Sequence, residues 1–145
     1  MNAGMTRSAS GVPGLDDVLH GGLIGGRLYL IDGEPGAGKT TLALQFLMEG
    51  ARQGESTLYV TLGETAGELR AGAASHGWDL SGIDIVELVA DEGELFGDSE
   101  LTMYHPSEIE LNETTKRILE AVERCKPRRM VLDSLSELRL LAQTS

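Results

Sequence analysis

The sequence predicts an α/β protein in which a parallel sheet carries helices on both faces. Three observations lead to this fold class: short apolar runs without polar alternation, helix-length segments between them, and glycines at the junctions. Such runs are typical of strands buried on both faces, and strands that alternate with helices form parallel sheets. With 145 residues, the chain is expected to form a single domain over residues 1–145.

The first half of the chain predicts two strand–helix units. Residues 28–32 form a short apolar run followed by a glycine, and we predict a buried strand there. The apolar-rich segment 39–53 has the length of a helix. A second strand is predicted over 57–62, and then a helix over 66–76 that ends at Gly77.

The second half predicts two more strands and two helices. Residues 83–88 form the third predicted strand, and residues 130–133 form the fourth. Between them a long helix opens with Ser107 and Glu110 in a capping-box pattern. A last helix is predicted over 134–143.

A glycine-rich motif follows the first predicted strand. Residues 33–40 read Gly-Glu-Pro-Gly-Ala-Gly-Lys-Thr and match the P-loop pattern G-x-x-x-x-G-K-T, with a strand before it and a helix after it. Glycines let successive backbone N–H groups surround a phosphate, and the helix N-terminus adds the positive end of its dipole. The predicted nucleotide-binding residues are Gly33, Pro35, Gly36, Ala37, Gly38, Lys39, Thr40 and Thr41.

Four side chains have predicted chemical roles. Lys39 is expected to reach the β- and γ-phosphates and to act in catalysis, while the hydroxyl of Thr40 ligates Mg²⁺. Asp133 ends an apolar strand, where a P-loop protein places its second acid directed at Mg²⁺; the alternative is that it caps a turn. Glu64 follows the second strand and could deprotonate the attacking water, or it could be an ordinary acid at the start of a helix.

Charge and composition disfavour several classes of partner. The net charge is −11, and residues 84–123 contain twelve acidic side chains against two basic ones. Such a surface repels phosphate backbones, so we expect no binding to nucleic acid or to an anionic membrane. The single cysteine, Cys125, excludes an internal disulfide and fits a reducing cytoplasm. Without a signal-peptide pattern or an apolar run that could span a bilayer, we expect a cytoplasmic protein.

The segments around the motif resemble the RecA-like ATPases, and within them the branch of KaiC and RadA. The similar segments are 10–16, 21–26, 40–47 and 106–137, so the resemblance covers nearly the whole chain. It implies a RecA-like fold, ATP as the nucleotide, ATP hydrolysis, and homo-oligomeric rings with nucleotide at the subunit interfaces.

The resemblance also implies a catalytic glutamate just after the second core strand. Glu64 stands there, followed by Thr65, where the clock members of the family carry paired glutamates. One carboxylate is enough to activate a water molecule. Glu64 is therefore the predicted base.

A further strand of the RecA-like fold follows Asp133 in the family and lies between the P-loop strand and the strand that ends at Asp133. Only twelve residues follow Asp133 here. We therefore expect a chain truncated after this strand, with an incomplete sheet. The DNA-contacting loops of recombinases, and the arginine that reaches a neighbour's nucleotide, are expected to be missing as well.

Several functions agree with these residues. The leading prediction is Mg-ATP binding and hydrolysis by a KaiC-like ATPase with a signalling or regulatory role. The alternatives are a regulatory module that binds nucleotide without turnover, and a RadA-type DNA repair ATPase, against which the acidic charge argues. Autokinase activity stays open, and no protein partner is indicated. The preference for ATP over GTP depends on the resemblance alone.

Overall fold

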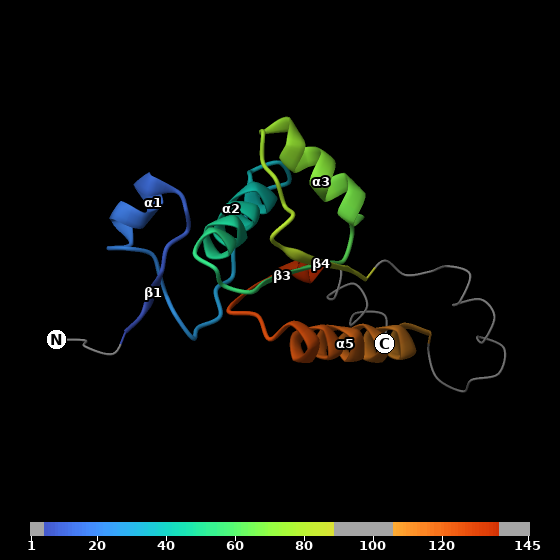
Figure 1. Cartoon of the computed structure of the whole chain (residues 1–145). Coiled ribbons are helices and arrows are strands. Elements are labelled where there is room, and N and C mark those ends of the chain that lie inside the picture. Colours follow the sequence, from blue (N-terminus) through green and yellow to red (C-terminus); the bar gives the residue numbers. More distant parts are fainter. Residues whose placement is uncertain (1–4, 89–105, 137–145) are drawn as a thin grey trace.

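The computed structural model describes residues 5–88 and 106–136, and it arranges them as an α/β fold around one parallel sheet (Figure 1). Within these residues the elements are β1 Arg7–Ser8, α1 Pro13–Val18, β2 Leu23–Ile24, α2 Lys39–Arg52, β3 Thr57–Thr61, α3 Ala66–Ser75, β4 Asp84–Glu87, α5 Pro106–Cys125 and β5 Arg129–Asp133. The strands and helices predicted between residues 39 and 133 are confirmed, and most of their ends agree to within one or two residues.

The main sheet has the order β4-β3-β5, and its strands are parallel. In the middle strand, Tyr59 lies opposite Ile85 of β4 and Val131 of β5. The ladder continues past the strand ends, because the Leu62 N–H donates to the carbonyl of Asp133 at 2.8 Å. The carboxyl ends of β3 and β5 are therefore side by side, which is the edge where ligands bind in such sheets.

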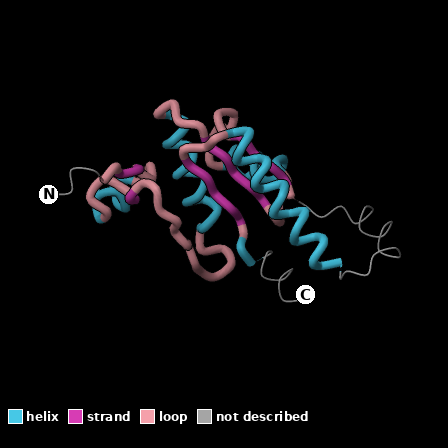
Figure 2. The backbone as a smooth tube through the Cα atoms, turned by 90° about the horizontal axis from the view of Figure 1, so that it is seen from below, coloured by secondary structure: helices cyan, strands magenta, loops and turns pink. Residues whose placement is uncertain are grey.

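Helices cover both faces of the sheet. Figure 1 shows α2 and α3 on one side and α5 on the other, and Figure 2, seen from below, shows α5 in front of the sheet and running along the strands. All five residues of β3 are buried, and successive side chains enter different cores. The core under α2 and α3 contains Leu44, Leu47, Tyr59, Leu69, Ala73, Leu80 and Ile83. The core under α5 contains Leu58, Val60, Leu62, Leu88 and Ala121.

The strand predicted over residues 28–32 is wrong in this structure. The segment forms no ladder, and Leu28, Leu30 and Ile31 are 99%, 72% and 50% exposed. The prediction rested on apolar content, whereas a strand forms only where neighbouring backbone groups can pair with it. No strand of the described residues lies beside this segment, so its backbone has no ladder to join.

Two further predictions concern helix ends. The helix α5 begins at Pro106, one residue before the predicted cap Ser107, and the side chains of Ser107 and Glu110 are outside the described residues. A helical turn begins at Leu135, but most of the predicted helix 134–143 also lies outside them.

One buried arginine connects the N-terminal part of the chain to the sheet. Arg129, the first residue of β5, is 3% exposed and forms an ion pair with Glu55 at 3.1 Å. Its guanidinium also donates to the carbonyls of Ala9 and Phe46 at 2.6 and 2.8 Å, and it stacks over the Phe46 ring at 4.7 Å. Because α2 carries Phe46, these contacts fix the helix that follows the glycine-rich loop against β5.

Candidate functional site

The glycine-rich loop leads directly into α2. Gly38 is the residue before the helix, with φ of +101°, and Gly36 has φ of +83°. Both values belong to the left-handed region, which side chains other than glycine rarely adopt. The loop is closed by a hydrogen bond from the Ala37 N–H to the carbonyl of Glu34 at 3.0 Å. Gly36 and Gly38 thus occupy positions where a residue with a side chain would be strained.

The charged side chains of the loop lie against its backbone. The amine of Lys39 donates to the carbonyls of Gly33 and Glu34, so the cation is folded over the loop. Asp32 accepts a hydrogen bond from the Gly33 N–H at 2.9 Å. A phosphate carries oxygens that could replace the two carbonyls as acceptors for the lysine.

Thr40 and Asp133, the two predicted metal ligands, are in direct contact. The Thr40 hydroxyl donates to Oδ2 of Asp133 at 2.9 Å, although 93 positions separate the residues. Helix α2 contributes Thr40 from its first turn, and β5 contributes Asp133 from its carboxyl end. A hydroxyl and a carboxylate are hard oxygen ligands, and Mg²⁺ commonly takes one or two such groups together with waters and substrate phosphates. The pair therefore fits this ion.

Sequence reasoning missed a third member of this cluster. The hydroxyl of Tyr59 donates to the same Oδ2 of Asp133 at 2.5 Å, and the tyrosine is fully buried. Burial, followed by the hydrogen bond and the charge of Asp133, raises the pKa of Tyr59 far above its ordinary value. The pairing of Tyr59 with Val131 explains the contact, since Asp133 lies two residues further along the same face of β5. This register is the signal that could have identified it.

Glu64 lies in the turn between β3 and α3, and its side chain is exposed. The helix start is satisfied by other residues: Thr65 and Glu68 form a reciprocal capping box, with hydrogen bonds of 3.1 and 3.0 Å. The backbone of Glu64 is held by the Thr61 hydroxyl, which accepts from its N–H at 3.2 Å and donates to its carbonyl at 2.9 Å. The carboxylate of Glu64 has no part in the helix cap.

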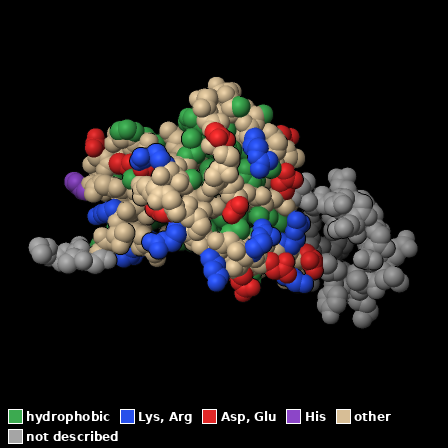
Figure 3. Space-filling view, in the orientation of Figure 1, with side chains coloured by type: hydrophobic (Ala, Val, Ile, Leu, Met, Phe, Trp, Pro, Cys, Tyr) green, Lys and Arg blue, Asp and Glu red, His purple; other side chains and the backbone are tan. Residues whose placement is uncertain are grey.

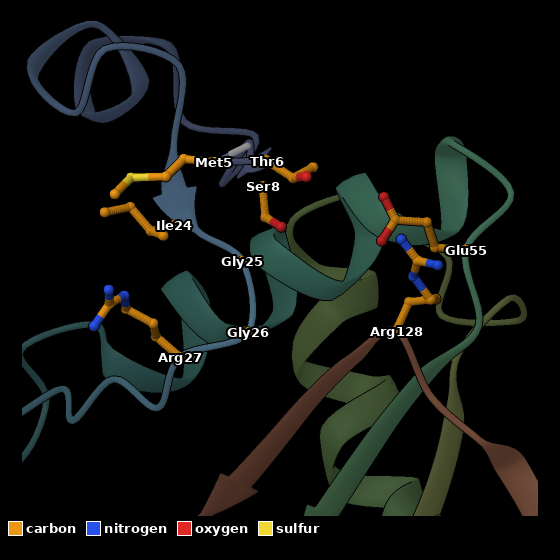
Figure 4. Close-up of a pocket in the computed structure, with 9 residues that line it drawn as sticks. All are labelled: Met5, Thr6, Ser8, Ile24, Gly25, Gly26, Arg27, Glu55 and Arg128. Carbon is orange, nitrogen blue, oxygen red and sulfur yellow. The ribbon is translucent and has the colours of Figure 1, made fainter. Parts of the chain in front are cut away.

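The remaining predicted binding residues, Pro35 and Thr41, are exposed and half-buried, respectively. Thr41 belongs to the first turn of α2, beside Thr40. The loop opens to solvent, and a pocket of about 550 Å³ lies elsewhere, lined by residues of the N-terminal segment together with Glu55 and Arg128. Figure 4 shows that pocket between Met5, Ile24 and Arg27 on one side and Glu55 and Arg128 on the other.

Two surface properties of the described residues bear on partners. None of their helices is both long enough and apolar enough to cross a bilayer. On the face seen in Figure 3, acidic and basic side chains are interspersed over the described part of the chain.

The described residues contain no group of three or more His, Cys, Asp or Glu side chains that could hold a metal ion by themselves. An ion at Thr40 and Asp133 would therefore need ligands from a bound phosphate or water.

The comparison with known proteins identifies the family. The family described as "ATPase: KaiC" matches residues 8–145, which is almost the whole chain. The chain belongs to the KaiC ATPase family. It is therefore a RecA-like P-loop domain of the KaiC branch, and its family is one of ATP-binding ATPases.

The relatives include circadian clock proteins and proteins of the UPF0273 group. The circadian clock oscillator protein KaiC of Parathermosynechococcus lividus is 33% identical over 138 residues, which cover 92% of this chain and 24% of that protein. A UPF0273 protein of Thermotoga maritima is 33% identical over 142 residues, covering 91% of this chain and 57% of the relative. The chain thus spans about a quarter of the first relative and a little over half of the second.

Proposed function

We propose that this KaiC-family domain binds Mg-ATP and hydrolyses it. The observation that carries the proposal is the 2.9 Å contact between Thr40 and Asp133 at the end of the glycine-rich loop. A loop with left-handed glycines, a lysine folded over it, and two hard oxygen ligands beside it form the parts that phosphoryl transfer requires. ATP, in preference to GTP, follows from the family.

In this proposal the backbone N–H groups of residues 33–41 surround the phosphates, and the N-terminus of α2 favours their negative charge. Lys39 turns from the loop carbonyls to the β- and γ-phosphates. Thr40 and Asp133 would hold Mg²⁺, and the bound ion would supply positive charge to neutralise the charge that develops on the phosphates. The protein then needs only a group that orients and deprotonates water.

Glu64 is the proposed base for this water. It follows β3 at the carboxyl edge of the sheet, and its carboxylate is exposed and not used by the cap of α3. The bond between Thr61 and the Glu64 backbone holds the turn in place. A carboxylate in this position can accept the proton as the water attacks the γ-phosphate.

The biological setting proposed for this activity is signalling or regulation, because relatives include clock proteins. Assembly into a homo-oligomeric ring, as in the family generally, is proposed as well. The single Cys125 fits a cytoplasmic location.

Steady-state phosphate release tests the proposal. Wild-type turnover is expected to need Mg²⁺, to disappear in Lys39→Ala and to fall by at least about a hundredfold in Glu64→Gln, as for loss of a general base. Glu120→Gln, an exposed acid on α5, is the matched control and should behave as wild type. Equal turnover of Glu64→Gln and Glu120→Gln would remove the base assignment.

The second candidate is a regulatory module that binds nucleotide without turnover. The unpaired segment 28–32, immediately before the loop, favours it, because a loop that is supported on one side only is less well fixed for catalysis. Calorimetry with Mg-ATP separates the two candidates. Binding that Lys39→Ala abolishes, without phosphate release, would select the binding module.

A further inference from the structure

Tyr59 introduces a buried hydroxyl into an otherwise apolar core. It occupies the middle of β3 with no exposed surface, among leucines of α2 and α3. Phenylalanine has the same ring and would fill the same space without a polar atom. The hydroxyl therefore needs a partner, since burying it without one is unfavourable. Its hydrogen-bond partner is the carboxylate of Asp133, at 2.5 Å.

The contact is selective for one oxygen of the carboxylate. Both Tyr59 and Thr40 donate to Oδ2 of Asp133, at 2.5 and 2.9 Å. An ionised carboxylate only accepts hydrogen bonds, and it has two oxygens to offer. Among the described residues no hydrogen bond engages Oδ1. Rotation of the carboxylate away from this orientation would break both bonds at once. The two donors therefore fix its orientation and occupy Oδ2, while Oδ1 stays available for another contact.

We propose that Tyr59 is a positioning residue of the metal site, which fixes the carboxylate of Asp133 so that Oδ1 can serve Mg²⁺ or one of its waters. Thr40 has two proposed roles at this site, because its hydroxyl donates to Asp133 and its oxygen is also a proposed ligand of the ion. Tyr59 is proposed only as a hydrogen-bond donor to Asp133. Its hydrogen bond orients Asp133 whether or not Thr40 shifts when nucleotide enters.

The inference rests on the proposed function, and it concerns binding of the ion with nucleotide, not turnover. Outer hydrogen-bond partners of metal ligands typically change metal affinity by about 10–100-fold when removed. We expect a value near the lower end for Tyr59, since Thr40 still holds the same oxygen.

The test is calorimetric titration of ADP into the 145-residue chain at a series of Mg²⁺ concentrations, beginning in EDTA. ADP is used because its binding can be read without hydrolysis. In Tyr59→Phe, the ADP affinity in EDTA should match wild type, while the Mg²⁺ concentration for half-maximal enhancement of ADP binding should rise about tenfold. The matched control is Tyr29→Phe, which removes a hydroxyl that accepts from the Ile24 N–H at 3.0 Å. It should leave both values unchanged.

A double variant shows whether Tyr59 acts through Asp133. In the Asp133→Asn background, Tyr59→Phe is expected to add no further change in the Mg²⁺ dependence, because the positioned group has already been altered. A further tenfold change in that background would overturn the proposal.

A measurement on the wild-type sequence covers the case in which Tyr59→Phe does not fold. The chain contains three tyrosines, so ¹⁹F NMR of protein labelled with 3-fluorotyrosine gives three resonances, assigned with Tyr29→Phe and Tyr104→Phe. The Tyr59 resonance should move when Mg²⁺ is added to the ADP complex. A resonance that stays in place would overturn the proposal.

The outcomes separate the two proposals. Wild-type protein that binds no nucleotide would overturn the proposed function, and this inference with it. Wild-type and Tyr59→Phe proteins with the same Mg²⁺ dependence of ADP binding would overturn the inference alone.

Discussion

Arg129 occupies the space that a side chain on Gly50 would need. A Cβ placed on Gly50 would lie 2.6 Å from Cδ and 2.8 Å from Nε of Arg129. The arginine cannot easily yield, because its guanidinium is held by Glu55 and by two backbone carbonyls. Glycine is therefore needed in the last turn of α2, because Arg129 of β5 packs directly against it.

Gly50→Ala is expected to destabilise the protein by about 1–3 kcal/mol, as overpacking of a filled core does. Gly72→Ala in α3 is the matched control, because its Cβ would meet no atom within 4 Å. That substitution should stabilise by about 0.5–1 kcal/mol through helix propensity. Urea denaturation of both variants measures the free energies of unfolding. If Gly50→Ala is as stable as Gly72→Ala, Arg129 is not held as described.

Arg129→Met is expected to lower the free energy of unfolding by about 3 kcal/mol. The substitution leaves Glu55 without its ion-pair partner and the Ala9 and Phe46 carbonyls without their donor. The exposed neighbour Arg128 serves as the control, and Arg128→Met should change stability by less than about 0.5 kcal/mol. Guanidinium chloride unfolding followed by circular dichroism compares the two. Equal effects would contradict the connecting role of Arg129.

Loss of the capping box of α3 is expected to lower the free energy of unfolding by less than Arg129→Met does. Thr65→Ala removes the acceptor of the Glu68 N–H and should cost about 1 kcal/mol. Thr65→Ser keeps the hydroxyl and should recover most of this loss. Chemical denaturation of the two variants is the measurement. A serine variant as unstable as the alanine variant would mean that the methyl group, and not the cap, matters at this position.

Much of the fold follows from local patterns in the sequence. The β3 and β5 runs are apolar because both faces of the sheet are covered, so the absence of alternation predicted them correctly. The approach of Thr40 to Asp133 was also expected, because the P-loop context implies it and parallel strands end at one edge. These inferences need only the period of the pattern and the motif.

The failures have a common physical origin in pairing between distant segments. Residues 28–32 have the composition of a strand, but a strand needs a neighbour that composition does not reveal. Tyr59 looked like an ordinary strand residue, and its contact with Asp133 depends on the register between β3 and β5. No sequence pattern pointed to Arg129 either: charged side chains are mostly exposed, yet partners from three distant segments bury this one.

The carboxylate of Asp16 is expected to make the stability of the fold depend on pH. Its Oδ1 accepts from the N–H and the hydroxyl of Ser10 at 2.8 and 2.7 Å, and its Oδ2 accepts from the Gly11 N–H at 3.2 Å. Burial, the largest single effect, would raise the pKa of Asp16, but the hydrogen bonds from Ser10 and Gly11 together outweigh it. The negative charge of Glu49 also raises the pKa of Asp16, but it is the smallest of these effects. The net result is a pKa of Asp16 below its ordinary value of 3.8.

A carboxyl whose pKa is lowered by folding stabilises the fold when ionised. The contribution is present in full above the unfolded pKa, and it is lost as the pH falls through the lower folded value. We therefore expect Asp16→Asn to be less stable than wild type near neutral pH, with a difference that shrinks below about pH 4. Urea denaturation between about pH 3 and 7 measures it, with Asp17→Asn, an exposed neighbour, as the control. A difference between wild type and Asp16→Asn that stays constant across this range would mean that the Ser10 and Gly11 bonds do not depend on the charge of Asp16.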